Sequence, residues 1–485
     1  NIYGVDIVGP AVEIAKLRCW LSIISELEED DIDEMDEEEL ALPNIAFNLR
    51  QGNSLIGYTG FPETTEDGNG YTLDSFNEDT VRTRYENIIN EITAYEEAIT
   101  SEQAEKHRKE ANRLLKNARD ELIDDVKDEF VAAGVENITP EKVETFDPFH
   151  WVLEYAEVYA DGGFDVIVGN PPWDRVKPLR DDYFVRYDDK FRTYMPEKKD
   201  QGQEELLEDE KIADGWEQYQ RDIEIMATYF NHSGVYELQQ PTVAGRTQAT
   251  ESELSALFLE RVFQIARNDG YVAQVLPGTI FTGASGKDLR MQLLDETEID
   301  VLAHFMNHGI FDGIDTRYKF SVLTFENQGS TDEVSSIYRE GEVEVLRNIS
   351  EVAFGTSRSV LERYSNEARS FPLLKSQKES EVMEKIVTNE PISKPIDDTW
   401  RANPYRELDR TNDSNLFVED ESDGQYPVLG GKNIHLFAYN SSYLGVEPPE
   451  FWSVDEDTDP DKSAKRRVRE KNFRKLKRGI YDAFD

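Results

Sequence analysis

Residues 162–173 constrain the fold of this chain more than any other stretch. Their middle part, residues 164–168, is a run of mostly apolar, β-prone residues that predicts a buried parallel strand. The sequence Gly-Asn-Pro-Pro-Trp follows at 169–173 and can continue neither a strand nor a helix, so the strand must end in a stiff, exposed loop. Because open α/β sheets bind ligands at the carboxyl ends of their strands, this loop is a candidate site.

The chemical groups of this loop indicate what it can hold. The Asn170 side-chain oxygen and the Pro171 carbonyl can both accept hydrogen bonds from one amino group, and the Trp173 ring offers a face to a planar base. This combination favours chemistry on an exocyclic amine. The alternative is that Asn-Pro-Pro is a simple turn and Trp173 a surface anchor. The apolar strand before the loop favours the site.

Predicted strands and helices alternate along the chain up to residue 330. This order predicts an α/β fold in which a mostly parallel sheet has helices on both faces and the last strand is antiparallel. We expect strands at 2–6, 45–49, 164–168, 271–276, 301–305 and 318–325, and helices at 10–25, 251–267 and 286–294, with a long helical hairpin at 80–133.

Two polar residues follow the first strands of this pattern. Asp6 ends the first strand, where a carboxylate is placed to accept both hydroxyls of a ribose. A surface or helix-capping role is the alternative for Asp6. Asn53 follows the strand expected at 45–49 and can accept a hydrogen bond through its oxygen, although a turn residue after Gly52 is an equally good interpretation.

The charge balance is strongly acidic. The chain has 485 residues, of which 53 are basic and 100 acidic, so its net charge of −47 repels nucleic acid at ordinary ionic strength. Near 1 M salt the Debye length is about 3 Å, which quenches this repulsion. We therefore expect a halophilic source. The alternative is an acidic protein that avoids nucleic acid.

Several classes of protein are disfavoured by composition. A single cysteine, Cys19, excludes an internal disulfide framework, and no Cys/His spacing indicates a zinc or other metal site. No apolar run approaches the roughly 20 residues of a membrane span and no signal peptide is seen, so we expect a cytoplasmic setting without a membrane partner. The chain opens on Asn1 and enters a strand at once, so we expect a fragment that lacks upstream residues.

Together these segments resemble the N6-adenine DNA methyltransferases of the type IIG restriction-modification and bacteriophage-exclusion types. Residues 164–173 resemble motif IV of amino-methyltransferases, and residues 2–18 resemble motif II. Residues 50–55 resemble motif III, in which many relatives carry an acidic residue where Asn53 stands. Residues 315–320 resemble motif VIII, whose aromatic residue packs on the target base. No stretch resembles motif I, the Gly-rich loop.

The resemblance implies S-adenosylmethionine as the cofactor and double-stranded DNA as the substrate. It implies a target adenine that is flipped out of the duplex and held between aromatic rings. The implied catalytic residues are Asn170, Pro171, Pro172 and Trp173, the implied cofactor-binding residues are Asp6, Ile7, Asn53 and Ser54, and the implied stacking residues are Trp173 and Phe320, with Tyr318 as the alternate. Core packing is the alternative for Phe320 and Tyr318.

The resemblance also implies two domains. A Rossmann-like methyltransferase domain spans 1–330, with a helical insertion at 80–133 and a polar excursion at 174–250. An α+β region at 331–485 resembles the start of a target-recognition domain. A basic segment at 462–478 interrupts the acidic chain and predicts a surface that faces phosphates, with a helix paired with the acidic body as the alternative. The predicted DNA-binding residues of the second region are Lys432, Lys465, Arg466 and Arg467.

The predicted function is site-specific transfer of a methyl group to adenine N6 in duplex DNA, in restriction-modification or phage defence, with other subunits of such a system as candidate partners. Motif IV by itself also occurs in methyltransferases acting on RNA or protein. The long insertions and the C-terminal region favour DNA. A DNA-binding specificity fragment without catalysis is the alternative from another class. No nuclease constellation is found, so no cleavage activity is predicted.

Overall fold

The computed structural model describes residues 2–25, 45–60, 78–98, 100–243, 245–247, 252–312, 314–339, 341–391 and 394, and short strands between 417 and 452. The chain divides into two compact units, Asn1–Val387 and Thr388–Asp485. Each unit is described by itself.

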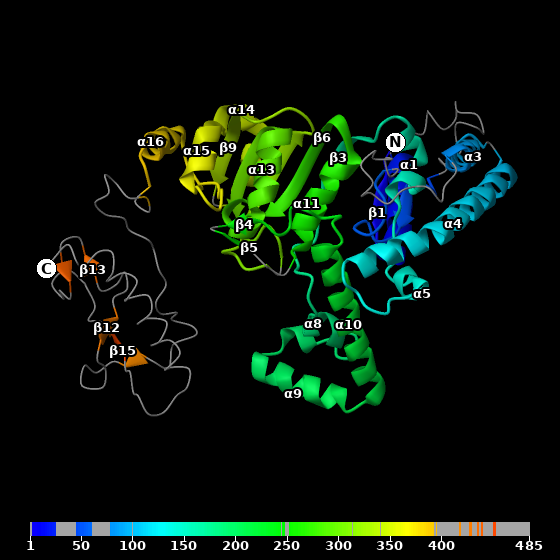
Figure 1. Ribbon diagram of the computed structural model, residues 1–485, viewed down its shortest axis with the longest axis horizontal. Coiled ribbons are helices and arrows are strands. Elements are labelled where there is room, and N and C mark those ends of the chain that lie inside the picture. The colour runs from blue at the N-terminus through cyan, green and yellow to red at the C-terminus, as the bar shows by residue number, and fades with distance from the viewer. Residues whose placement is uncertain are drawn as a thin grey trace. The chain divides into compact units, whose positions relative to one another are not determined.

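A six-stranded sheet is the centre of the larger unit (Figure 1). The four strands β3, β6, β7 and β9 run in one direction, while β8 is antiparallel to β6 and β7, and β10 is antiparallel to β9. The predicted α/β sheet with an antiparallel last strand is therefore confirmed. In spatial order the strands are β10 (Phe354–Ser357), β9 (Glu333–Arg339), β7 (Glu298–Met306), β8 (Lys319–Glu326), β6 (Ala266–Pro277) and β3 (Phe164–Gly169).

Both faces of this sheet are covered. On one face α11 (Leu254–Ile265) and α13 (Lys287–Glu296) contribute Leu259, Val262 and Leu293 to the largest apolar cluster. On the other face Phe305 and Phe320 pack with side chains of η4 (Val343–Asn348) and α14 (Ile349–Val352). This two-sided cover explains why β7 and β8 are nearly continuous apolar runs.

A second, two-stranded parallel sheet holds the start of the chain. It pairs β1 (Gly4–Asp6) with β2 (Leu49–Gln51), and α1 (Gly9–Ser25) follows β1 as predicted. The strand predicted at 45–49 is wrong in its position. The backbone N–H of Asn48 donates to Ile45 O (3.2 Å) and closes a turn, so the strand begins only at Leu49.

The predicted helical hairpin at 80–133 is confirmed as α3 (Glu78–Glu96) and α4 (Ser101–Ala132). Thr100 caps α4 by accepting a hydrogen bond from the backbone N–H of Gln103 (3.3 Å). Apolar residues at helical spacing on the two helices, including Ile92 and Leu115, form a shared core.

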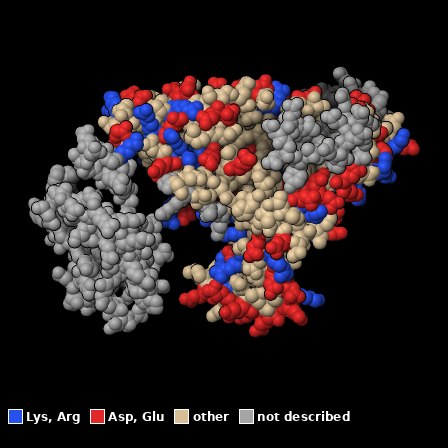
Figure 2. Space-filling model, in the orientation of Figure 1, with Lys and Arg blue, Asp and Glu red and all other residues tan. Residues whose placement is uncertain are grey.

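Within the stretch 174–250, predicted as a polar excursion, residues 180–232 form a helical arm of α8 (Arg180–Phe184), α9 (Pro196–Leu207) and α10 (Glu210–His232), which projects from the rest of the unit (Figure 1). The arm has a small core in which Tyr183, Phe184 and Phe191 pack with partly buried aromatic residues of α10. Acidic side chains crowd its far end (Figure 2). The sequence did not predict this core, because the few aromatic residues that form it are spread over a strongly polar stretch.

The structure places the unit boundary later than the predicted 330/331. Strands β9 and β10 extend the same sheet, and the compact unit ends at Val387. The further elements of this unit are α5 (Pro140–Glu144), α6 (Trp151–Glu154), α7 (Ala156–Ala160), η2 (Phe191–Thr193), β4 (Thr242–Val243), β5 (Arg246–Thr247), α12 (Thr279–Thr282), η3 (Ala284–Gly286), α15 (Arg358–Tyr364) and α16 (Gln377–Val387).

The smaller unit is described only in short strands. An antiparallel sheet has the order β11 (Phe417–Val418), β15 (Glu450–Trp452), β12 (Tyr426–Val428), and β13 (Ile434–His435) pairs with β14 (Ala438–Tyr439). The predicted DNA-binding residues Lys432, Lys465, Arg466 and Arg467 lie outside the described residues.

Candidate functional site

Strand β3 ends where the sequence predicted, at Gly169, which is in register with Gln274 of β6. The Asn170 side chain that follows is exposed, and Pro171 is buried. The strand itself is not buried as predicted, because Val166 is 61% and Val168 77% exposed. The reason is its position: within the described residues β3 pairs with β6 on one side and forms the edge of the sheet.

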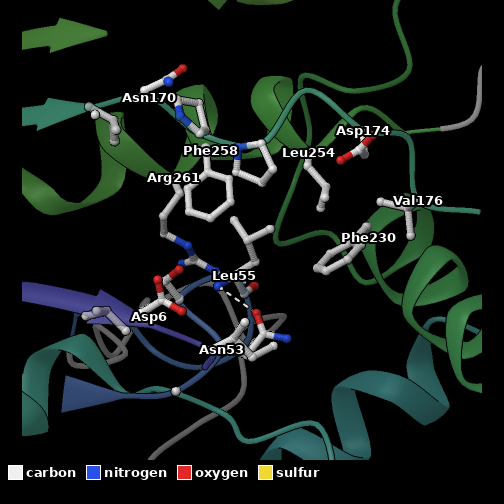
Figure 3. Close-up of a pocket in the computed structure, with 18 of the residues that line it drawn as sticks. Asp6, Asn53, Leu55, Asn170, Asp174, Val176, Phe230, Leu254, Phe258 and Arg261 are labelled. Carbon is white, nitrogen blue, oxygen red and sulfur yellow. Dashed lines mark hydrogen bonds between the residues drawn. The ribbon is translucent and has the colours of Figure 1, made fainter. Parts of the chain in front are cut away.

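A cavity of about 820 Å³ brings the two groups of predicted site residues together (Figure 3). Asp6 and Asn53 enter it from the ends of β1 and β2, and Asn170 enters it from the end of β3. In Figure 3, Asn170 lies across the cavity from Asp6 and Asn53. The predicted residues that line this cavity are Asp6, Ile7, Asn53, Ser54, Asn170, Pro171 and Pro172.

The Asp6 carboxylate closes a turn and lines the cavity. Its Oδ1 accepts a hydrogen bond from the backbone N–H of Val8 (2.7 Å), just before α1 begins at Gly9. It also lines the cavity at the end of β1. The donor of this hydrogen bond lies before the first residue of α1, so Oδ1 closes a turn ahead of the helix and does not cap it, and the same carboxylate faces the space in which a ligand would lie.

Asn53 was predicted to offer its side-chain oxygen to a ligand, but in the structure that oxygen has a partner within the loop. Its Oδ1 accepts a hydrogen bond from the backbone N–H of Leu55 (3.1 Å) within the loop. An N–H donor must face an acceptor, so the assignment of Oδ1 and Nδ2 follows from this contact. This contact uses one of the two lone pairs of the oxygen, and the Nδ2 group can donate to a ligand. The turn interpretation is correct for the oxygen.

Trp173 does not face the cavity with the rest of its loop. It packs among Phe311, Tyr318 and Phe320, with 5.7 Å and 13° between the Trp173 and Tyr318 rings. Phe320 is 2% exposed and belongs to the core, whereas Tyr318 is partly exposed. Burial raises the pKa of the Tyr318 hydroxyl above its usual value, so the ring stays neutral.

His150, which precedes β3 in the sequence, packs against neighbouring side chains. Its ring stacks on Tyr58 at 5.5 Å and faces the backbone N–H of Tyr58 through Nδ1 (3.3 Å). Burial lowers its pKa from 6.5 to about 4, so the ring is neutral and accepts that hydrogen bond.

Sequence reasoning missed the wall formed by α10 and α11. Phe230 of α10 and Leu254, Phe258 and Arg261 of α11 line the cavity (Figure 3). The α11 segment was recognised only as an amphipathic helix. No local signal marks Arg261, because its backbone partner Leu55 lies 206 residues earlier in the sequence.

The described residues contain neither a membrane-spanning helix nor a cluster of metal ligands. None of their helices is long and apolar enough to cross a membrane. In the same described ranges no group of three or more His, Cys, Asp or Glu side chains is arranged to hold a metal ion.

The sheet and the cavity define a mixed α/β protein with an Asn-Pro-Pro loop at the end of a strand, opposite a carboxylate at the end of another. The model of the Eco57I restriction-modification methylase family matches residues 1–202 and 227–311, which is more than half of the chain. The chain therefore belongs to the Eco57I restriction-modification methylase family.

A relative from Methanocaldococcus jannaschii carries the assigned name of type II restriction enzyme and methyltransferase. It is 30% identical over 230 residues, a match that covers 36% of this chain and 18% of the relative. The chain thus spans less than a fifth of the length of that relative.

Solved structures add only remote likenesses. The type IIG restriction endonuclease BpuSI matches at 13% identity with a TM-score of 0.23, over 49% of this chain and 30% of that one. The M protein of the type I restriction enzyme EcoKI matches at 15% identity with a TM-score of 0.22, over 30% of this chain and 42% of that one. Scores this low carry no argument about the fold.

Proposed function

We propose that this chain is the catalytic part of a DNA methyltransferase of a restriction-modification or phage-defence system, and that it methylates adenine at N6 in duplex DNA. The observation that carries the proposal is the shared cavity of Asp6, Asn53 and Asn170. It combines groups suited to a nucleoside cofactor with groups suited to an amine. Membership of the Eco57I restriction-modification methylase family supports the same class of reaction.

The cavity suits S-adenosylmethionine in size and in chemistry. A volume of about 820 Å³ lies within the range of small-molecule sites. The Asp6 carboxylate can accept from ribose hydroxyls, and the Asn53 Nδ2 group can donate to a ring nitrogen. Bound there, S-adenosylmethionine supplies a methyl group on a positively charged sulfur. Apolar side chains of the opposite wall, including Leu254 and Phe258, exclude water from the same space.

The Asn-Pro-Pro loop would act on the amine. The lone pair of adenine N6 is delocalised into the ring, which makes it a poor nucleophile. Acceptors at the Asn170 side chain and the Pro171 carbonyl draw the N6 hydrogens out of the ring plane and free the lone pair for attack in line with the departing sulfur. The N6–C bond forms as the C–S bond breaks, and the surplus proton passes to water.

This chemistry relies on positioning rather than on a strong base. The described lining of the cavity contains no histidine or cysteine. A neutral amide and a backbone carbonyl provide what an amine needs, because they accept hydrogen bonds without taking the proton. In a duplex the target base is unreachable, so it must be flipped out and stacked. Tyr318 is the more accessible candidate for stacking, and Trp173 and Phe320 support its ring.

The test is transfer of tritium from methyl-labelled S-adenosylmethionine to genomic DNA that lacks adenine methylation. Parallel reactions contain RNA or a protein extract. We expect label in DNA and N6-methyladenine after digestion to nucleosides. Label in RNA or protein would move the chain to another amino-methyltransferase class. Cofactor binding by calorimetry without transfer to any substrate would favour a specificity fragment.

A further inference from the structure

We propose that Arg261 is a positioning residue that fixes the separation between the cofactor wall and the amine wall of the cavity. The inference rests on the proposed function. Arg261 lies in α11, is 2% exposed, and lines the cavity beside Phe258. Figure 3 shows its side chain reaching toward Leu55, between Asn170 on one side and Asp6 and Asn53 on the other.

The partners of Arg261 are unusual for a buried cation. Within the described residues the hydrogen bonds that it donates all end on neutral oxygens. Nη2 donates to Leu55 O (2.8 Å) and to the Tyr236 hydroxyl (2.7 Å), and Nη1 donates to Gln264 Oε1 (2.7 Å). The carboxylates of Glu129 and Glu260 are close enough to interact electrostatically with Arg261, and they offset part of the cost of burying its charge. An apolar side chain would satisfy packing alone without that cost.

The carbonyl of Leu55 is the point that Arg261 holds. It accepts from Arg261 and also from the Tyr236 hydroxyl (2.6 Å). The same loop is fixed on its other side by segment 147–151: Asn53 N donates to Asp147 O (2.7 Å), and Trp151 Nε1 donates to Ser54 O (3.0 Å). Among these hydrogen bonds, the one from Arg261 joins the loop to α11, and Leu55 and Ile56 also pack in one apolar cluster with Leu257 of α11.

This contact links the two walls of the cavity. The loop carries Asn53 and belongs to the same wall as Asp6. Helix α11 runs directly into β6, which pairs with β3, and β3 carries Asn170 at its end. Arg261 therefore joins the cofactor wall to the element that supports the amine wall. Because displacement of a reacting group by 1 Å can cost about 10²-fold in rate, this connection controls alignment of the methyl group with the amine.

The guanidinium is suited to this role by its shape. Its planar fork reaches the Leu55 carbonyl and the Tyr236 hydroxyl at once, and the Tyr236 hydroxyl also donates to that carbonyl. A lysine ammonium can keep the charge but cannot hold both oxygens in a fixed plane. The variant Arg261→Lys thus loosens the connection without creating a large cavity.

A matched control exists in α13. Arg290 is also buried, and it donates to the backbone carbonyls of Arg369 (2.6 Å), Ala368 (2.6 Å) and Ile280. It does not line the cavity. Arg290→Lys should therefore cost stability in the same way as Arg261→Lys, while the two cavity walls keep their separation.

The experiment compares wild type, Arg261→Lys, Tyr236→Phe and Arg290→Lys by methyl transfer, by cofactor titration, by thermal unfolding and by amide exchange of the Asn53 loop. We expect Arg261→Lys to lower kcat by about 10²-fold with a smaller change in KM for S-adenosylmethionine. Tyr236→Phe should lower kcat less, and both should speed exchange in the loop. Arg290→Lys should lower the unfolding temperature and keep the wild-type kcat where it is folded.

Two outcomes would overturn the inference. One is a wild-type kcat and wild-type loop exchange in folded Arg261→Lys. The other is an equal fall of kcat in Arg261→Lys and Arg290→Lys, which would indicate a general loss of stability. Failure of the proposed function is a separate result: wild type then binds no cofactor and transfers no methyl group. In that case loop exchange still reports whether Arg261 holds the loop.

Discussion

The ring of Tyr318 lies parallel to the ring of Trp173, with centroids 5.7 Å apart and 13° between the planes. Trp173 is in turn 6.3 Å from Phe320, which is buried below them in the core. The three rings lie in the order Tyr318, Trp173, Phe320. Tyr318 is partly exposed at one end, and Phe320 packs against Trp173 from the core at the other. The resemblance favoured Phe320 for stacking on a base. The structure makes Tyr318 the more accessible of the two rings.

This arrangement predicts different effects of two alanine variants. Tyr318→Ala should weaken binding of DNA by about 1–3 kcal/mol, the usual value of base-aromatic stacking. Tyr318→Phe keeps the ring and should retain wild-type affinity. Phe320→Ala should instead lower the free energy of unfolding by about 3–5 kcal/mol, because it opens a cavity in the core. Fluorescence anisotropy with labelled DNA and denaturant titration measure the two effects. Unchanged DNA affinity in Tyr318→Ala would exclude it as the stacking residue.

Asp6 provides a second prediction, for cofactor binding. Asp6→Ala should weaken binding of S-adenosylmethionine by about 1.5–3 kcal/mol, the value of hydrogen bonds to a charged group. Because Oδ1 also accepts from Val8 N, the alanine variant loses the turn before α1 as well. Asp6→Asn keeps an acceptor for this turn and removes the charge, so it separates the two effects. Calorimetry that finds wild-type affinity in both variants would contradict the ribose assignment.

The negative charge predicts dependence on salt. With a net charge of −47, and with acidic side chains crowded at the far end of α9 and α10 (Figure 2), self-repulsion should destabilise the fold in dilute buffer. We expect a higher unfolding temperature at about 2 M than at about 0.05 M KCl, because screening lengths fall with ionic strength. A variant with lysine at the exposed positions Glu204, Glu205 and Glu208 should show a smaller difference. Equal unfolding temperatures at the two salt concentrations would contradict the expectation.

Buried His304 predicts the effect of acid on stability. Its Nδ1 lies 2.7 Å from Ser321 Oγ, and burial, with a smaller effect of Lys319, lowers its pKa from 6.5 to about 4. Between these values the unfolded chain binds a proton that the folded chain does not. The contribution of His304 is therefore fully present above pH 6.5 and is lost as pH falls toward 4, by about 1.4 kcal/mol per pH unit.

The measurement is the free energy of unfolding against pH for wild type and His304→Gln. The glutamine can still accept from Ser321 and does not titrate, so the variant should lose less stability between pH 6.5 and 4. The same change at the exposed His308 is the control for removal of a histidine. Parallel curves for wild type and His304→Gln would show that His304 is protonated in the folded state as well.

The sequence was most informative where local pattern and strand ends coincide. Runs of apolar residues predicted β3, β6, β7 and β8 closely, and the polar residues at strand ends predicted that Asp6 and Asn170 would line a site. Both predictions depend only on neighbouring residues. A buried strand is a run of apolar residues, and the residues that follow it are polar or conformationally rigid.

Features that depend on distant residues were missed. Strands β9 and β10 join the sheet although the sequence pattern beyond residue 330 no longer alternates regularly. The late start of the strand expected at 45–49 has a local cause instead, which is the turn closed by Asn48 N and Ile45 O. Arg261 is indistinguishable from a surface cation on an amphipathic helix until Leu55 and Tyr236 are brought to it. The exposure of β3 also depends on distant residues. Val168 belongs to an apolar run typical of a buried strand, yet its side chain is exposed because β3 lies at the edge of the sheet.

Asn170 tests the proposed chemistry most directly, because its side-chain oxygen is the proposed acceptor for the amine and the residue lines the cavity across from Asp6 and Asn53. The measurement is tritium transfer to unmethylated duplex DNA by wild type and Asn170→Ala, with DNA affinity and unfolding temperature measured on the same preparations. The proposed mechanism predicts that Asn170→Ala abolishes transfer while both other quantities stay close to wild type, because the exposed side chain contributes little to the fold. Transfer at the wild-type rate by Asn170→Ala would contradict it.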